Sequence, residues 1–127
     1  MTLVVDASAV AEILFATERG QRAAAKLQQH TLVAPQHLTA EVASVVRGWS
    51  LGGQITEPEA LQAFREFAQL GIEQMDIAEL LPEVWALRHN LSAYDAMYVV
   101  LARALGCELL TLDERLAAAV PDCTIFP

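Results

Sequence analysis

Four acidic residues stand at positions where strands are expected to end or helices to begin. Asp6 follows the short apolar run Thr2–Val5, and Asp113 follows a similar run late in the chain. Asp95 and Glu41 each fall in the first turn of an expected helix. In a parallel sheet, strand ends and the starts of the following helices share one edge, so the four side chains are expected to line one cleft.

Carboxylates that share a cleft repel one another, and at least one pKa rises unless a cation lies between them. Mg²⁺ suits such a group because it accepts a few carboxylates, keeps several waters and leaves room for phosphate oxygens. It can also activate a bound water and neutralise charge on a phosphodiester, so no histidine, cysteine or lysine nucleophile is needed. Each acid alone is better explained as a helix cap or a partner of the helix dipole than as a metal ligand. Only the set of four favours a metal site.

The elements that must position these acids alternate between β-like runs and helical stretches, which predicts an α/β fold with a parallel sheet. One domain is expected over residues 1–127, as a three-layer α/β/α sandwich with about five strands and seven helices. The expected strands are Thr2–Val5, Leu32–Ala34, Ile72–Met75, Glu108–Leu112 and Thr124–Phe126.

Helix boundaries are indicated by capping residues and glycines. Thr56 and Glu59 form a T-x-x-E capping box, with Pro58 early in the helix. Asp76 and Glu79 repeat that spacing, although Pro82 could place the start of that helix later. Helices are expected from about Ala9, over Glu18–Gln29, over Ala40–Leu51, after Thr56, from Asp76 to Arg88 or His89, from Ser92 to Gly106, and from Glu114 to about Val120.

The formal net charge of −8 argues against a basic nucleic-acid clamp, and Lys26 is the only lysine. The two cysteines, Cys107 and Cys123, are expected to be small buried residues of a cytoplasmic protein. With no C-x-x-C spacing and three scattered histidines, a structural zinc site is not expected. The apolar runs are too short for a membrane span, so no membrane association is expected.

Three motifs resemble those of a known family. The segment from Val4 to Ala9 resembles the first motif of PIN-domain proteins, and Tyr94-Asp95 with Thr111-x-Asp113, about 18 residues apart, resembles the C-terminal motifs of the VapC toxin branch. The resemblance implies a small endoribonuclease that needs Mg²⁺, or Mn²⁺ as a substitute. It further implies a homodimer and a cognate antitoxin that holds the enzyme inactive. Carried over by position, the acidic quartet is Asp6, Glu41, Asp95 and Asp113, with the neighbouring hydroxyls of Ser8 and Thr111.

Other polar and aromatic residues permit two interpretations. Arg88 and Asn90, before the Asp95 helix, and Arg115, after Asp113, could contact RNA or a partner. The helix dipole alone would also favour arginine at a helix end. Tyr94 and Tyr98 are expected to pack on neighbouring helices, His30 and His37 to be ordinary loop residues, and Glu114 to lie on a solvated helix face.

Two other acidic α/β designs do not fit the sequence. A phosphoacceptor receiver needs an aspartate after a middle strand and a late lysine, whereas Asp76 reads as a cap and Lys26 is too early. A haloacid-dehalogenase-like phosphatase needs D-x-D, and Asp6-Ala7-Ser8 lacks the second acid. Two functions therefore stay open: a metal-dependent endoribonuclease toxin, and a catalytically weak binding module acting mainly through an antitoxin-bound, transcription-repressing complex.

Overall fold

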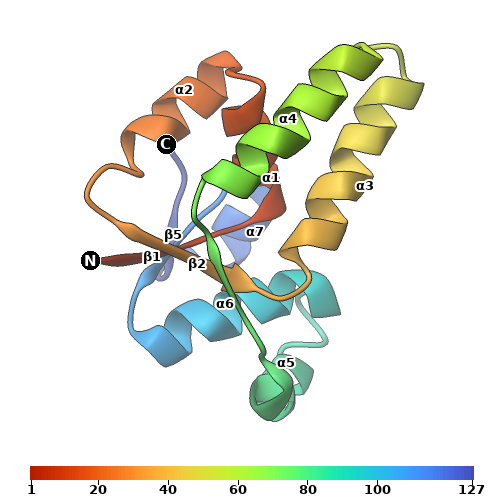
Figure 1. The fold of residues 1–127 in the computed structure, drawn as a ribbon. Helices are drawn as coiled ribbons and strands as arrows, with labels where there is room; N and C mark the ends of the chain where they lie inside the picture. Colours follow the sequence, from red (N-terminus) through yellow and green to blue (C-terminus); the bar gives the residue numbers. More distant parts are fainter.

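The computed structural model describes all residues, 1–127, and consists of a parallel five-stranded sheet between helical layers (Figure 1). The strand order is β3-β2-β1-β4-β5, and all four pairings are parallel. Helices α1, α3 and α4 pack together on one face, whereas α6 contacts β1, β2 and β4 from the other. The strands are β1 (Thr2–Val5), β2 (Thr31–Pro35), β3 (Glu73–Met75), β4 (Glu108–Leu110) and β5 (Thr124–Ile125).

Seven α-helices and one short 3₁₀ segment connect the strands. The helices are α1 (Ala7–Leu14), α2 (Glu18–Ala25), α3 (Leu38–Leu51), α4 (Glu57–Gln69), α5 (Leu81–Ala86), α6 (Ala93–Leu105) and α7 (Glu114–Ala119), with the 3₁₀ segment at Ala78–Leu80. The chain runs outward from β1 through β2 to β3, then returns to β4 on the other side of β1. The connections after β1 and β4 therefore diverge, which is where open α/β sheets form their binding crevices.

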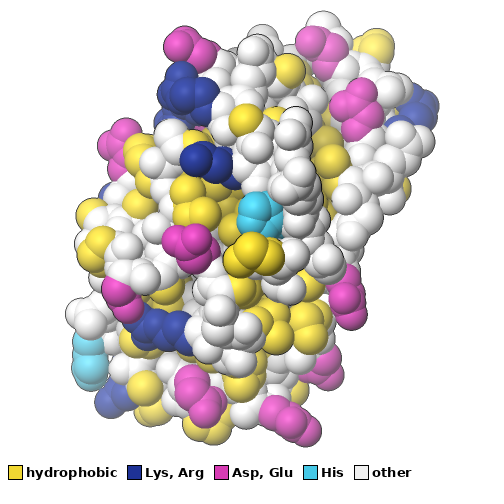
Figure 2. All heavy atoms as spheres, turned by 90° about the vertical axis from the view of Figure 1, so that its left-hand side faces the viewer, with side chains coloured by type: hydrophobic (Ala, Val, Ile, Leu, Met, Phe, Trp, Pro, Cys, Tyr) yellow, Lys and Arg dark blue, Asp and Glu magenta, His cyan; other side chains and the backbone are white.

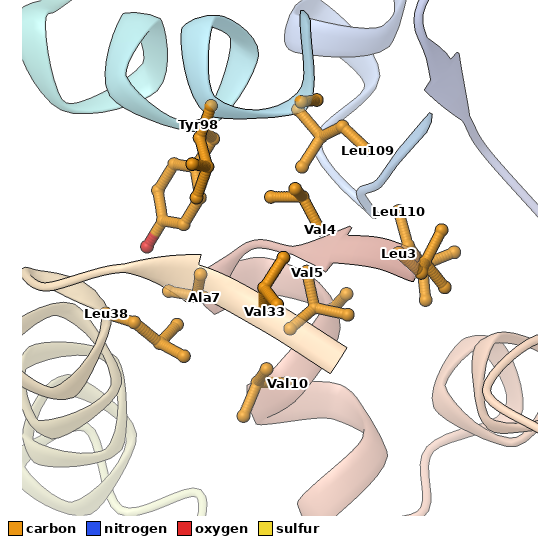
Figure 3. Close-up of a cluster of buried hydrophobic side chains, with 14 of the residues drawn as sticks. Leu3, Val4, Val5, Ala7, Val10, Val33, Leu38, Tyr98, Leu109 and Leu110 are labelled. Carbon is orange, nitrogen blue, oxygen red and sulfur yellow. The ribbon is translucent and has the colours of Figure 1, made fainter. Parts of the chain in front are cut away.

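The core lies between the sheet and both helical layers. Residues of the two central strands, including Val4, Leu109 and Leu110, are fully buried. Figure 3 shows Val4 and Leu109 on the side of the sheet that faces Tyr98 of α6, whose ring lies against the sheet and whose hydroxyl points toward the start of α3. Burying both sheet faces explains why the central strands read as continuous apolar runs rather than as alternating patterns.

The expected three-layer fold and its five strands are confirmed, with some ends shifted. The strand expected at Glu108–Leu112 ends at Leu110, and Pro35 is the last residue of β2 rather than the residue that follows it. The helix expected over Glu18–Gln29 ends at Ala25, and Gln29 adopts a positive φ of 66° that a continuing helix does not allow.

Capping explains which helix starts were predicted correctly. Thr56 and Glu59 form both hydrogen bonds of the expected capping box, and Ser92 caps α6 through Asp95 N. The box expected at Asp76 and Glu79 was wrong. Asp76 Oδ1 accepts from Ala78 N at 2.8 Å and starts only the 3₁₀ turn, and α5 begins later, at Leu81, with Pro82 in its first turn.

On the side of the molecule where the chain begins, the surface carries no large area of a single kind of side chain. Figure 2 shows the face where the chain begins, and acidic, basic and apolar side chains are intermingled there without a continuous basic area. None of the helices combines the length and the apolar composition that a membrane crossing requires.

Candidate active site

Asp6 sits directly after β1 and is also the N-cap of α1. Its Oδ1 accepts hydrogen bonds from Ser8 Oγ at 2.6 Å and from Ala9 N at 3.0 Å, and its Oδ2 accepts from Thr111 Oγ1. The residue is only 4% exposed. Burial raises the pKa of Asp6 to about 6. The three hydrogen bonds oppose this rise because they stabilise the charged carboxylate.

Two hydroxyl groups connect the end of β1 to the end of β4. Ser8 Oγ donates to Asp6 and accepts from Leu112 N at 2.9 Å. Thr111 is fully buried, and its Oγ1 donates to Asp6 and accepts from Asp113 N at 3.0 Å. The expectation that Ser8 and Thr111 lie beside the acids therefore agrees with the geometry, and each hydroxyl both donates and accepts.

Asp113 follows this connection and caps α7. Its Oδ1 accepts from Arg115 N at 2.9 Å and from Leu116 N at 3.3 Å. The cap interpretation of Asp113 and its place in the cleft are therefore both correct, as they are for Asp6. Arg115 Nε lies 4.0 Å from the same carboxylate, but this side chain is 92% exposed, so the pair is a weak, solvent-screened one.

Asp95 and Glu41 approach from the first turns of α6 and α3. Burial and then the charge of Asp113 raise the pKa of Asp95, and the charge of Glu41 adds to that effect. Asp113 also raises the pKa of Asp6. The carboxylates are therefore close enough to influence one another, as expected for acids that share one cleft.

Glu41 is held by two ring side chains. Tyr98 donates its hydroxyl to Glu41 Oε1 at 2.7 Å, and His37 Nε2 lies 3.4 Å from the same oxygen. Tyr98 is 1% exposed, and burial together with this hydrogen bond raises its pKa well above the ordinary value. A neutral, buried phenol that donates to a carboxylate fixes one oxygen of Glu41 and leaves the other without a protein partner.

The four acids line one cleft of about 460 Å³ at the carboxyl edge of the sheet. Thr111 lies behind this cleft rather than in its wall. No lysine or arginine belongs to the lining, which consists of Asp6, Ala7, Ser8, His37, Ala40, Glu41, Ser44, Val45, Tyr94, Asp95, Tyr98 and Asp113. The cleft is therefore strongly acidic, and a bound cation would offset its charge at neutral pH.

Comparison with known proteins agrees with this geometry. The family model described as PIN domain matches residues 3–120. The chain belongs to the PIN domain family. It is 38% identical to Ribonuclease VapC3 of Mycobacterium tuberculosis, over 94% of this chain and 88% of that protein. It is also 36% identical to Ribonuclease VapC3 of Pyrobaculum aerophilum, over 95% of this chain and 96% of that protein. These relatives place this PIN domain in the VapC branch.

Solved structures support the fold. The crystal structure of PAE2754 from Pyrobaculum aerophilum superposes with a TM-score of 0.69 at 18% identity, covering 98% of this chain and 83% of that one. A toxin-antitoxin complex from Klebsiella pneumoniae superposes with a TM-score of 0.66 at 16% identity, covering 98% of this chain and 97% of its own. Both likenesses confirm the α/β/α architecture of the PIN domain.

The donor set of the PIN domain cleft fits a hard divalent cation. Its ligand atoms are carboxylate oxygens, which Mg²⁺ and Mn²⁺ prefer, and neither cysteine is in the lining. The structure contains no preformed group of three or more His, Cys, Asp or Glu side chains that could hold a metal ion. Mg²⁺ does not need one, because it keeps several waters and binds proteins through one or two carboxylates.

Sequence reasoning assigned wrongly or missed several residues in the cleft or behind it. His37 was expected to be an ordinary loop residue, but it lines the cleft. Tyr98 packs as expected, yet its hydroxyl also holds Glu41. Arg19 of α2 was not singled out, although its guanidinium donates to the carbonyl of Leu112, just before Asp113. Charge and periodicity carry no signal for any of these contacts.

Arg88 and Asn90 were candidates for RNA or partner contact, and neither lines the cleft. Both residues are exposed. The Arg88 guanidinium lies 4.6 Å from the centre of the Trp85 ring, and Nη1 donates to the Trp85 carbonyl at 3.1 Å. A contact with RNA or a partner stays a prediction for Arg88, Asn90 and Arg115.

Proposed function

We propose that this PIN domain protein is a divalent-metal-dependent endoribonuclease and acts as the toxin of a toxin-antitoxin pair. The observation that carries the proposal is the convergence of Asp6, Glu41, Asp95 and Asp113 on one cleft whose lining contains no lysine or arginine. The names of the relatives, which are ribonucleases, and the structural neighbour, a toxin-antitoxin complex, support the same conclusion.

The four carboxylates would contribute to holding the cation in different ways, directly or through its bound waters. Asp6 is fixed on both oxygens by hydroxyl and amide donors, so it offers a rigid anchor at the base of the cleft. Tyr98 orients Glu41, whereas Asp95 and Asp113 complete the acidic rim. Mg²⁺ or Mn²⁺ bound there would supply a water of lowered pKa and a positive charge opposite the phosphodiester.

A cleavage assay with a matched control tests the proposal. Purified protein is incubated with total RNA and Mg²⁺ or Mn²⁺, and the new ends are sequenced. We expect defined cleavage that disappears in excess EDTA and in the Asp95→Asn variant. Asp76→Asn is the control, because Asp76 is exposed and lies outside the cleft. Cleavage that continues unchanged in EDTA would show that the reaction does not depend on a metal.

The toxin assignment has its own test. A cognate antitoxin is expected to bind the protein and suppress cleavage, and the free protein is expected to be a homodimer in the cytoplasm. Co-expression with the neighbouring open reading frame, followed by light scattering and the same RNA assay, measures both properties. A protein that binds its partner and represses transcription but never cuts RNA would instead be the catalytically weak binding module.

A further inference from the structure

Tyr94 is an exposed aromatic residue at the mouth of the acidic cleft. It precedes Asp95 on α6, lines the same cleft, and leaves 59% of its surface exposed. It was expected to pack on a neighbouring helix, but it is not part of the hydrophobic core. An aromatic ring left open beside a nuclease cleft has an unused flat surface, which is what a nucleobase can stack on.

The position of Tyr94 is fixed from behind by His37. The two ring centres are 5.6 Å apart with an interplanar angle of 32°, and the His37 ring is 4.7 Å from that of buried Tyr98. His37 Nε2 also lies 3.2 Å from the Tyr94 carbonyl oxygen. Both polar neighbours of Nε2, this carbonyl and Glu41 Oε1, are acceptors, so Nε2 carries the proton and donates. Tyr94 is therefore a supported surface rather than a loose side chain.

The charge of the cleft favours an RNA contact that does not depend on charge. No lysine or arginine lines the cleft, and the formal net charge of the chain is −8. Phosphates beside the cleft therefore meet no cationic side chain in its lining, and the usual electrostatic contribution to RNA affinity is small there. Stacking on an aromatic ring is independent of charge and contributes about 1–3 kcal/mol per base.

We propose that Tyr94 is a stacking platform for one nucleobase of the RNA next to the scissile phosphate. This inference rests on the proposed ribonuclease function and assigns to that site a residue that holds the RNA. A base within a duplex is covered by its neighbours and has no free face to offer, whereas a base in a loop can turn out onto the ring.

The test combines a residue change with a matched change in the RNA. The substrate is a short oligoribonucleotide that spans the cleavage site found for the wild type, with and without a single abasic nucleotide beside that site. Binding is measured by fluorescence anisotropy in an Asp113→Asn background, and kcat and KM are measured in the wild-type background. Tyr94→Ala removes the ring but keeps the backbone carbonyl that His37 contacts, and Tyr94→Phe keeps the ring.

Tyr94→Ala is expected to weaken binding and raise KM by about 5- to 150-fold, the range that corresponds to stacking of one base. Tyr94→Phe should bind within about twofold of the parent. With the matching abasic oligonucleotide, wild type and Tyr94→Ala should become equal. Phe64→Ala is the control, because Phe64 is an exposed aromatic residue that lies outside the cleft.

Two results would overturn the stacking platform: unchanged binding by Tyr94→Ala, or the same loss on intact and abasic RNA. In each case defined, metal-dependent cleavage by the wild type would leave the proposed ribonuclease function standing. If the wild type cuts no RNA under any metal condition, the ribonuclease function and the stacking platform fail together.

Discussion

Tyr98 on α6 donates a 2.7 Å hydrogen bond to Glu41 on α3, across 57 residues of sequence. The two helices lie on opposite faces of the sheet, so this bond joins the layers at the edge where the cleft opens (Figures 1 and 3). The phenol is buried and neutral, and its hydroxyl orients one carboxylate. Tyr98 therefore packs in the core and also orients a carboxylate of the acidic site.

Tyr98→Phe removes this donor and keeps the ring. We expect metal affinity or kcat to fall by about 10- to 100-fold, as is usual when a partner that orients a ligand is lost. Isothermal titration with Mn²⁺ measures the affinity independently of activity, and circular dichroism checks the fold. If both metal affinity and kcat stay at the wild-type value, Tyr98 serves packing alone.

Thr111→Val removes the buried hydroxyl that donates to Asp6 Oδ2. The charged carboxylate then lacks one donor, which costs about 1–3 kcal/mol of unfolding free energy. The loss should be larger at pH 7 than at pH 4, where protonation of Asp6 reduces its need for a donor. Urea unfolding at the two pH values measures the difference. Thr39→Val, at an exposed threonine outside the cleft, should show no such pH dependence.

The metal-free protein should lose stability as the pH rises through the titration range of Asp6. The pKa of Asp6 is about 6 in the folded state against an ordinary value of 3.8. Between these two pH values the folded chain retains a proton that the unfolded chain releases. The contribution of Asp6 to the free energy of unfolding therefore falls by about 3 kcal/mol as the pH rises. Urea unfolding in EDTA from pH 4 to 7 tests this. Asp6→Asn should lack that component, and an equal slope in both proteins would contradict it.

Divalent cations should stabilise the folded state because they relieve the repulsion within the cleft. At a Mn²⁺ concentration of 100 times Kd, the expected gain in unfolding free energy is about 2.7 kcal/mol. Differential scanning calorimetry would show it as a rise in Tm. Asp95→Asn should reduce the rise, whereas Asp76→Asn should keep it. Equal stabilisation of both variants would place the cation outside this cleft.

Gly20 allows α2 to approach α1 closely. A Cβ built at Gly20 would lie 2.0 Å from the carbonyl oxygen of Glu12, so Gly20→Ala must push the helices apart. We expect a loss of at least about 1–3 kcal/mol in unfolding free energy, together with displacement of the adjacent Arg19 from the Leu112 carbonyl. Gly48→Ala in α3 is the control, because nothing lies within 4 Å and helix propensity should improve. Equal stability of the two variants would contradict the close contact.

The parts of the fold that depend on local rules could be predicted from the sequence. Buried strands are apolar runs, and the box at Thr56 marks a helix start, so these elements were found within a few residues. The acids were found because strand ends and helix starts share one edge of the sheet. Asp76 was misread because an Asx turn and a helix cap use the same residue types.

The contacts between layers could not be predicted in this way. His37 is drawn into the cleft by packing between Tyr94 and Tyr98, and Arg19 reaches Leu112 across 93 residues of sequence. No local pattern specifies which side chain of one helix meets which carboxylate or carbonyl of another. These contacts depend on tertiary geometry, which single-sequence periodicity does not contain.

The hydrogen bond from Thr111 to Asp6 joins residues 105 positions apart, and it has a consequence for how the protein is made. A nascent chain emerges from the ribosome with Asp6 early, but β4 and the Thr111 hydroxyl follow only near the end of synthesis. Until then Asp6 has neither its partner nor its burial, and Asp113 has not been translated. The growing polypeptide therefore cannot assemble the cleft, and a translating ribosome would be spared the cutting activity of its own unfinished product.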